Sequence, residues 1–399
     1  MSQDLLQNVK ILDLARNAPG AFCTMTLGDL GAEIIKVETP QHGKPITGSG
    51  VSPLPDAKGE KKAAYDALNR NKKSIAIDLK LGKGRDIFYK LVGQADVIVE
   101  GFRPGASARL KIDYDSLRAV NPGIVYCSIT GYGQDGPYRD LPGHDINYIS
   151  VAGALSMIGY PDRPPAIPMN LIGDYAGGAL YAVIGILAGL LAKRTSGEGR
   201  YLDIAMTDGA MALLSRLGNE YFRDGAVPGR GQDRWNGGTP SYNSYQTRDG
   251  KYISIGCLEP VFWENLCTAL ELKELIPLQF TGGDKAAEVT ATLKATFLTR
   301  TRDEWFAFLK DKNICIAPVY DFDEAINDPQ IVHRKLVTEI SHPKLGKVRQ
   351  LALPIKISGT AWQVKSTAPF LGQHTDIILK GLGYQTGEIK ALREAGTIQ

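Results

Sequence analysis

Short apolar runs alternate with amphipathic stretches through the first half of the chain. Five mainly apolar runs have the length and composition of buried strands: 9–14, 33–38, 74–79, 96–102 and 123–133. Helical patterns lie between several of them: 19–31, 84–95 and 114–120. Strands that alternate with helices are typical of βαβ units, so this half predicts an α/β fold with a doubly wound parallel sheet.

The longest apolar stretch, residues 175–192, contains no charged side chain and reaches the lower length limit of a membrane span. It is rich in small residues and follows an acidic residue, and the rest of the chain has the mixed composition of a globular protein. We therefore expect a buried helix of the large domain and no membrane association. A further strand pattern follows within 200–210.

The residue composition of the chain changes from residue 222 onward. Residues 222–240 are rich in Gly, Pro and Arg, as in a linker, and 244–256 have the alternation of a β-hairpin. Two helical patterns, 262–272 and 301–312, precede a strand at 314–320. These patterns predict a large domain over 1–224, a smaller α+β domain over 225–325, and a return of 326–399 to the large domain.

Composition narrows the class of protein. The chain has 399 residues, 43% hydrophobic and 22% charged, with a formal net charge of +3, which gives no reason to expect nucleic-acid binding. Its five cysteines are scattered and lack CxxC pairing, which argues against a zinc site or a disulfide scaffold. The first residues lack the pattern of a signal peptide. We expect a cytoplasmic protein.

Candidate binding residues follow the predicted strands, where ligands of parallel sheets bind. Arg103 lies between glycine and proline at the end of 96–102, and Lys72 and Lys73 lie in the 69–74 stretch, directly before the third predicted strand. Tyr132 and Gly133 belong to a GxGxxG match at 131–136. Because two prolines follow this match where a dinucleotide fingerprint needs a helix, it predicts a glycine-rich turn lining an active site.

Three titratable side chains are candidates for acid/base chemistry. His144 lies in a turn beside a carboxylate, Asp174 directly precedes the long apolar segment, and Glu259 follows an apolar strand. Each has an ordinary structural explanation as well: Asp174 suits a helix N-cap, and a lone histidine is more often structural than catalytic. Taken singly, these residues do not distinguish the two interpretations.

Together, the motifs resemble the class III CoA-transferase family. The similarity is carried by LGDLGAEIIKVE, NRNKKSIAIDLK, ADVIVEGFRPG, NPGIVYCSITGYGQDGPY, GDYAGG and SGEGRYLDIAMTDG, and it spans nearly the whole chain. Three further segments, GHDINY, NLIGDYAGG and SIGCLEPVFW, look like the α-methylacyl-CoA racemase branch. The resemblance implies an interlocked homodimer of subunits with a Rossmann-like large domain and a small domain, whose active sites combine both subunits.

The resemblance also implies roles for individual residues. His144 and Asp174 would be the two acid/base groups, and Glu259 would orient His144. The residues implied to support this pair are Asp145, Tyr148, Asn170, Tyr175 and Ala176. Those implied to bind coenzyme A, which is part of the substrate, are Lys36, Lys72, Lys73, Arg103, Tyr132 and Gly133. Thr39 stands where many racemase relatives carry a basic residue, so Lys36 or the 69–74 loop is expected to hold the adenosine end.

The chemistry expected from this set is racemisation of an α-branched acyl-CoA thioester. One group removes the α-proton, the other returns a proton to the opposite face, and backbone N–H groups of Tyr175 and Ala176 stabilise the enolate. No metal or redox cofactor is required.

The alternatives are CoA transfer with Asp174 as nucleophile and thioester binding without catalysis. Five aromatic residues are candidates for the acyl pocket: Trp235, Tyr242, Tyr245, Phe262 and Trp263.

Overall fold

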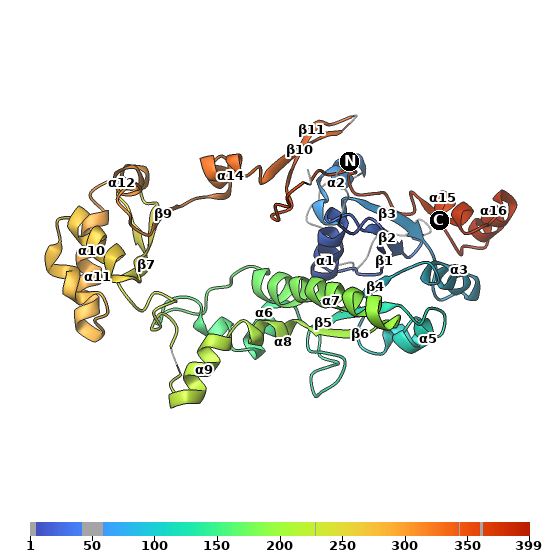
Figure 1. The fold of residues 1–399 in the computed structure, drawn as a ribbon, viewed down its shortest axis with the longest axis horizontal. Coiled ribbons are helices and arrows are strands. Elements are labelled where there is room, and N and C mark those ends of the chain that lie inside the picture. The colour runs from blue at the N-terminus through green and yellow to red at the C-terminus, as the bar shows by residue number, and fades with distance from the viewer. Residues whose placement is uncertain (1–4, 42–58, 228, 343, 360–361) are drawn as a thin grey trace. The chain divides into compact units, whose positions relative to one another are not determined.

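The computed structural model describes residues 5–41, 59–227, 229–342, 344–359 and 362–399 (Figure 1). The chain forms two compact units. The first consists of residues 1–152, 169–214 and 330–399, and the second of residues 153–168 and 215–329. The C-terminal segment thus packs with the N-terminal half of the chain.

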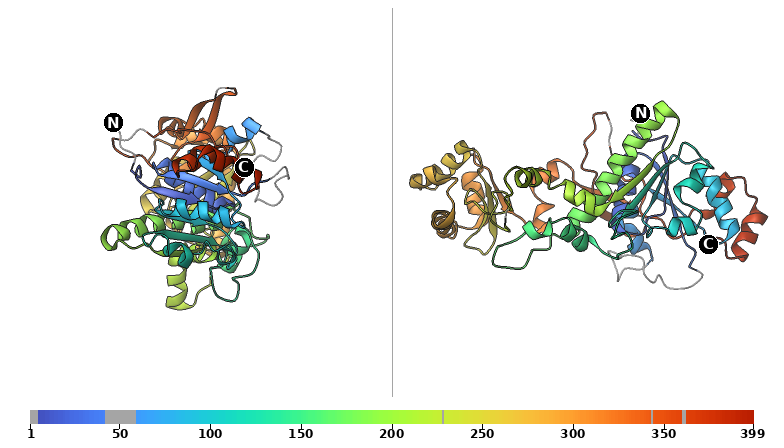
Figure 2. Two further views of the ribbon diagram at one scale, coloured as in Figure 1. Left: turned by 90° about the vertical axis from the view of Figure 1, so that its right-hand side faces the viewer. Right: turned by 90° about the horizontal axis from the view of Figure 1, so that it is seen from below.

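A six-stranded sheet forms the centre of the first unit (Figures 1 and 2). Its strands are β1 (Lys10–Asp13), β2 (Glu33–Glu38), β3 (Lys72–Ala76), β4 (Val97–Glu100), β5 (Val125–Thr130) and β6 (Tyr201–Ala205). The order is β3-β2-β1-β4-β5-β6 and every neighbouring pair is parallel. This order, with its reversal between β1 and β4, is that of a doubly wound Rossmann-like sheet, as the sequence predicts.

Helices cover both faces of this sheet because successive strand residues point to opposite sides. On one face, Leu12 and Ile98 belong to a core with helices α3 (Gly82–Val92), α5 (Tyr114–Arg118), α15 (Thr375–Gly381) and α16 (Thr386–Glu394). On the other, Ile11 and Val97 belong to a core with α1 (Ala18–Asp29) and α7 (Tyr181–Ser196). Burial of each such aliphatic side chain contributes about 1.5–3 kcal/mol.

Shorter elements complete the first unit. They are α2 (Gly59–Tyr65), η1 (Ala67–Asn69), α4 (Ala106–Arg109), α6 (Asp145–Val151), the π-helix η3 (Leu171–Leu180), α8 (Met206–Ala212) and an antiparallel hairpin, β10 (Val337–His342) and β11 (Gly346–Leu351). The π-helix η3 runs directly into α7. It packs against α8, α1 and α6, which places it above the carboxyl end of the sheet.

The apolar helix formed by η3 and α7 is only partly buried. Within Leu171–Ser196, 39% of the most apolar window is buried, and by length and composition alone this stretch would suffice to cross a membrane. Leu180, Ile184 and Leu191 are 45%, 60% and 66% exposed, whereas Ile186 is fully buried in the sheet core. The prediction of a buried helix is therefore wrong for the single chain, because one face of the helix has no cover among the described residues.

The second unit contains a three-stranded antiparallel sheet, β7 (Tyr242–Gln246), β8 (Tyr252–Gly256) and β9 (Ile316–Val319). The turn between β7 and β8 contains Gly250 with a φ of 77°, a conformation that favours glycine. Helices accompany this sheet: η2 (Leu155–Met157), α9 (Ser215–Asp224), α10 (Pro260–Ala269), η4 (Lys273–Leu278), α11 (Gly283–Phe297), α12 (Arg302–Leu309), α13 (Phe322–Ala325) and, at the boundary with the first unit, α14 (Pro329–His333).

Two of the aromatic residues proposed for the acyl pocket belong to the core of this unit. Tyr245 and Trp263 are each 1% exposed and pack with Phe297, and the Tyr245 and Phe297 rings stack at 5.2 Å. Their rings are therefore not available to a ligand, so that prediction is wrong for both. Trp235 is 44% exposed and contacts the ring of Tyr242.

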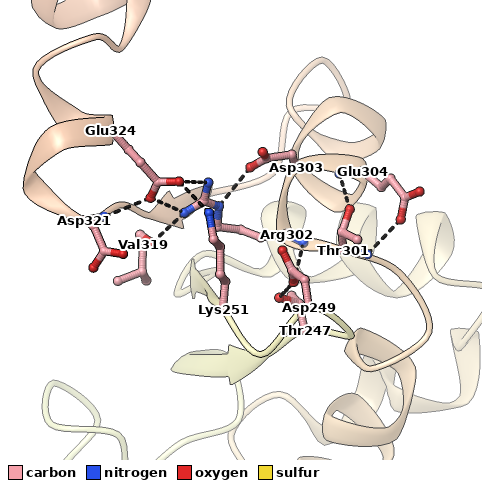
Figure 3. Close-up of polar contacts among 10 residues, drawn as sticks. All are labelled: Thr247, Asp249, Lys251, Thr301, Arg302, Asp303, Glu304, Val319, Asp321 and Glu324. Atoms are coloured by element: carbon pink, nitrogen blue, oxygen red, sulfur yellow. Dashed lines mark hydrogen bonds and ion pairs between the residues drawn. The ribbon is translucent and has the colours of Figure 1, made fainter.

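An ion-pair network holds α12, α13 and the small sheet together (Figure 3). The Arg302 guanidinium, 2% exposed, donates to both carboxylate oxygens of Glu324 at 2.7 and 2.9 Å, and Lys251 donates to the same carboxylate at 2.5 Å. These cations hold the pKa of the Glu324 carboxyl well below its usual range. The network is structural, since Arg302 and Lys251 donate to partners within the same unit.

Candidate active site

His144 lies at the carboxyl end of the sheet, between the loop that follows β5 and helix α6. Its backbone is extended, with φ −132° and ψ 178°, as an N-cap requires. Its N–H donates to Asn147 Oδ1 at 3.0 Å, and its carbonyl accepts from the Asn147 N–H at 2.8 Å. The imidazole is exposed. The helix start therefore fixes the backbone of His144 and leaves its side chain accessible.

Asp174 approaches this histidine from the π-helix η3. Its N–H donates to Asp145 Oδ2 at 2.8 Å, and its own Oδ2 accepts from Asn170 Nδ2 at 3.1 Å. Asp145 directly follows His144, so one hydrogen bond links α6, which carries the imidazole, to the helix that carries the carboxylate. The sequence alone does not show this link, although it singles out all four residues.

The environment of Asp174 makes its carboxyl easier to protonate. Burial raises the pKa of Asp174 above its usual value, and the negative charge of Asp145 adds to this effect. The hydrogen bond from Asn170 and the charge of His144 act in the opposite direction. A carboxyl with a raised pKa next to an imidazole is suited to accept and donate protons.

The glycine-rich turn after β5 makes room for Tyr148. A Cβ at Gly131 would lie 2.2 Å from Tyr148 Cε1, and one at Gly143 would lie 2.8 Å from the same atom. The Tyr148 hydroxyl donates to the Gly143 carbonyl, and the Tyr132 ring contacts Tyr148 edge-on at 5.1 Å. Burial raises the pKa of Tyr148 to about 12. Residues 131–143 contain no helix, in agreement with a turn and not a dinucleotide loop.

Two arginines lie at the carboxyl edge where the strand order reverses. Arg103 follows β4 and is exposed, and its charge lowers the pKa of Tyr148 against the larger effect of burial. Arg16 follows β1, donates to Thr39 Oγ1 at 3.0 Å and lies 5.8 Å from the ring centroid of Phe102. Arg16 was not predictable from the sequence, because a single arginine after a strand forms no motif.

Two more arginines surround the GFRPG loop. A side chain at Gly105 would meet the guanidinium of Arg109 at 3.5 Å and that of Arg139 at 4.0 Å. Both are exposed, and neither belongs to a motif predicted from the sequence. Arg109 lies only six residues after Arg103, so its proximity follows from the short helix α4. Arg139 comes from the loop after β5, and only the fold brings it near.

The lysines predicted to bind coenzyme A are engaged elsewhere. Lys72 is buried, and its Nζ donates to Asp13 Oδ2 at 2.9 Å and to Thr24 Oγ1 at 2.8 Å. Burial lowers the pKa of Lys72, and Asp13 opposes that effect. A phosphate does not reach this ammonium, so the prediction is wrong for Lys72.

Lys36 and Lys73 each pair with a carboxylate of β2. Lys36 lies 3.3 Å from Glu38, and Lys73 donates to Glu33 at 2.6 Å. Because Glu33 begins β2, this pair brings Lys73 toward the amino end of the strand, away from the edge that carries His144. Gly133, with a φ of 95°, stays in the turn, where its N–H donates to Thr130.

Glu259 belongs to the second unit. It is exposed and lies at the N-cap position of α10, in the short connection between β8 and α10. Its predicted role toward His144 stays a prediction. Tyr175 and Ala176 lie within η3, directly after Asp174, and the Tyr175 ring contacts Phe22 of α1 at 4.8 Å.

Comparison with known proteins gives one family. The model of CoA-transferase family III matches residues 6–375. The chain is 32% identical to human alpha-methylacyl-CoA racemase, over 99% of this chain and 97% of that protein. It is 33% identical to human succinyl-CoA:glutarate CoA-transferase, over 98% and 90% respectively. A solved CAIB/BAIF family protein from Brucella suis has a TM-score of 0.78 and 30% identity, covering 94% of this chain and 98% of that one.

Proposed function

Since the chain belongs to CoA-transferase family III, we propose that it is an enzyme acting on acyl-CoA thioesters, and specifically a racemase or epimerase of 2-methylacyl-CoA. The observation that supports the racemase is the pairing of His144 with Asp174 through Asp145. Racemisation needs two acid/base groups, one for each face of the α-carbon. An imidazole and a carboxyl of raised pKa supply such a pair.

In the proposed reaction the Asp174 carboxylate removes the α-proton of one enantiomer. The electron pair of the broken C–H bond moves toward the thioester oxygen and forms an enolate. Protonated His144 then donates its proton to the opposite face, which leaves neutral His144 and protonated Asp174. The reverse direction exchanges the two roles. We do not assign the enolate donors to the N–H groups of Tyr175 and Ala176, because both residues lie inside the π-helix η3, where each N–H bonds the carbonyl five residues earlier.

The phosphates of the substrate's coenzyme A are assigned to the carboxyl edge between β1 and β4. Arg16 and Arg103 face this switch point, where ligands of doubly wound sheets bind. Planar guanidinium groups donate two parallel hydrogen bonds to a phosphate. Arg16 therefore supplies the cation that Thr39 does not.

CoA transfer is the second candidate, because the chain is as similar to a succinyl-CoA:glutarate CoA-transferase as to a racemase. In that reaction the Asp174 carboxylate attacks the donor thioester, which forms a mixed anhydride and releases the CoA thiolate. The thiolate then attacks the aspartyl carbonyl, which releases the donor acid and leaves an aspartyl-CoA thioester. Transfer gives no role to an imidazole facing the α-carbon, and for that reason we favour racemisation.

We also propose that the protein is a homodimer. The exposed apolar residues along η3 and α7 form a continuous stripe at helical spacing: Leu180, Ile184, Leu187 and Leu191. An apolar surface of this kind usually marks an interface. A second copy of the chain would cover it, and in the proposed dimer Glu259 of one subunit would orient His144 of the other.

Deuterium exchange separates the two reactions. A single enantiomer of a 2-methylacyl-CoA, incubated with the protein in deuterated water, is expected to gain α-deuterium while its configuration scrambles. Mass spectrometry and chiral chromatography of the released acid measure both. Absence of exchange, together with CoA transfer to an added carboxylate such as succinate, would refute the racemase and support the transferase.

A further inference from the structure

We propose that Asp145 is a positioning residue that holds Asp174 at a fixed place relative to His144 and sets a negative charge against the Asp174 carboxyl. The proposal rests on the proposed function for its catalytic consequence. Its structural basis is the carboxylate itself, which is joined to His144 through the chain and to Asp174 through a hydrogen bond.

The geometry leaves Asp145 little freedom. Its side chain is 4% exposed, and its Oδ2 accepts from the Asp174 N–H at 2.8 Å. A Cβ at position 173 would lie 2.9 Å from the same Oδ2, so only glycine there allows this approach. Rotation of the Asp145 carboxylate would therefore break the contact with η3. The hydrogen bond acts as a short strut between the first residue of α6 and the first turn of η3.

The second oxygen of Asp145 has no ordinary structural explanation. Asp145 Oδ1 is buried and accepts no hydrogen bond from the described residues. A buried polar atom without a partner costs about 1–3 kcal/mol, and an amide at this position would supply the same acceptor to Asp174 with no net charge. A purely structural strut therefore does not need a carboxylate. The charge itself is the feature that requires a role.

That role is electrostatic, because Asp145 faces a second carboxyl. Its negative charge raises the pKa of Asp174, in addition to the larger effect of burial. The titratable groups that interact with Asp174 are His144 at the N-cap of α6, and Asp145 and Tyr148 within α6. Of these, Asp145 is the carboxylate that contacts the Asp174 backbone.

Two substitutions separate position from charge. Asp145→Asn keeps an oxygen acceptor for the Asp174 N–H and removes the charge. It is expected to move the acid limb of the kcat/KM profile for exchange to lower pH. Asp145→Ala removes both, and its kcat is expected to fall about 10²-fold with KM little changed, because misplacement of a catalytic group by about 1 Å has that effect.

Asp208→Asn is the matched control. It also removes one negative charge from an element packed against η3, and is expected to leave the acid limb in place. Circular dichroism and thermal unfolding verify that each variant is folded. An unmoved acid limb in Asp145→Asn, or wild-type kcat in Asp145→Ala, would overturn the proposal.

A direct titration keeps this test independent of the reaction. Carbon-13 NMR of aspartate-labelled protein, with Asp174 assigned from Asp174→Asn, follows the Asp174 carboxyl in wild type and in Asp145→Asn. The expected result is a lower Asp174 pKa in the variant. If wild type gives no α-exchange, the proposed function fails, whereas an equal Asp174 pKa in both proteins would refute the role of Asp145.

Discussion

The ionised form of Asp174 lowers the stability of the folded protein. Its pKa is raised by burial and by Asp145, so the ionised form is less stable in the folded protein than in the unfolded chain. For a carboxyl whose pKa rises on folding, stability is full at low pH. It declines as the pH rises from the unfolded pKa through the folded pKa.

Asp174→Asn is therefore expected to stabilise the protein at pH 7 while it abolishes racemisation. Removal of the buried charge should raise Tm by about 1–3 °C, and the difference from wild type should shrink as the pH falls below the unfolded pKa. The rate of racemisation should fall by at least about 10²-fold, the usual contribution of a general acid or base. Calorimetry at two pH values measures the first effect. A lower Tm for the variant at pH 7 would contradict the assigned environment.

At the scale of elements, the chemistry depends on how closely η3 approaches α8. A Cβ at Gly209 would lie 2.0 Å from the carbonyl oxygen of Gly177, so the two backbones touch. Asp174 precedes Gly177 by less than one turn of the π-helix. Short π-helical segments often occur at functional sites, and here the segment carries the carboxyl toward His144.

Gly209→Ala is expected to force these helices apart. The added methyl should lower the free energy of unfolding by about 1–3 kcal/mol and reduce exchange by displacing Asp174. Gly218→Ala on α9 is the matched control, because its nearest contact would be Phe222 at 3.6 Å. That variant should be neutral or slightly more stable. Equal stability of Gly209→Ala and wild type in urea unfolding would show that the close approach is not important.

The strands were predictable from sequence, and several functional details were not. Runs such as EIIKVE are apolar on both faces, which is the pattern of a buried parallel strand, and β2 has the predicted bounds. The π-helix was not predicted, because its residues suit an ordinary helix equally well. Lys72 was predicted to bind a ligand because its actual partner was not visible in the sequence. That partner, Asp13, lies 59 positions away, and no local pattern indicates such a pairing.

The candidate site was predictable only in part for the same reason. His144 and Asp174 each had a structural explanation from sequence, and the fold brings them together through Asp145. Arg16 and Arg139 became visible only when the loops after β1, β4 and β5 were placed at one edge. The exposure of Ile184 was not predictable, since the uncharged apolar residues around it have the pattern of a buried helix.

At the scale of the whole molecule, the uncovered stripe on α7 predicts association of two chains. Ile184→Glu, at a position 60% exposed in the single chain, should place two charges in the proposed interface and weaken the dimer at least tenfold. Val120→Glu, at a position 42% exposed on the first unit after α5, is the matched control and should leave the mass unchanged. Light scattering at micromolar concentration measures both. A monomeric wild type would contradict the homodimer.

The central claim is that one imidazole and one carboxyl serve opposite faces of the same α-carbon. Deuterium exchange from each separate enantiomer, in His144→Ala and in Asp174→Asn, tests it most directly. Each variant is expected to exchange the α-proton of one enantiomer without inversion, and the two variants should retain opposite enantiomers. Inversion at the wild-type rate in either variant, or retention of the same enantiomer by both, would contradict the two-base site.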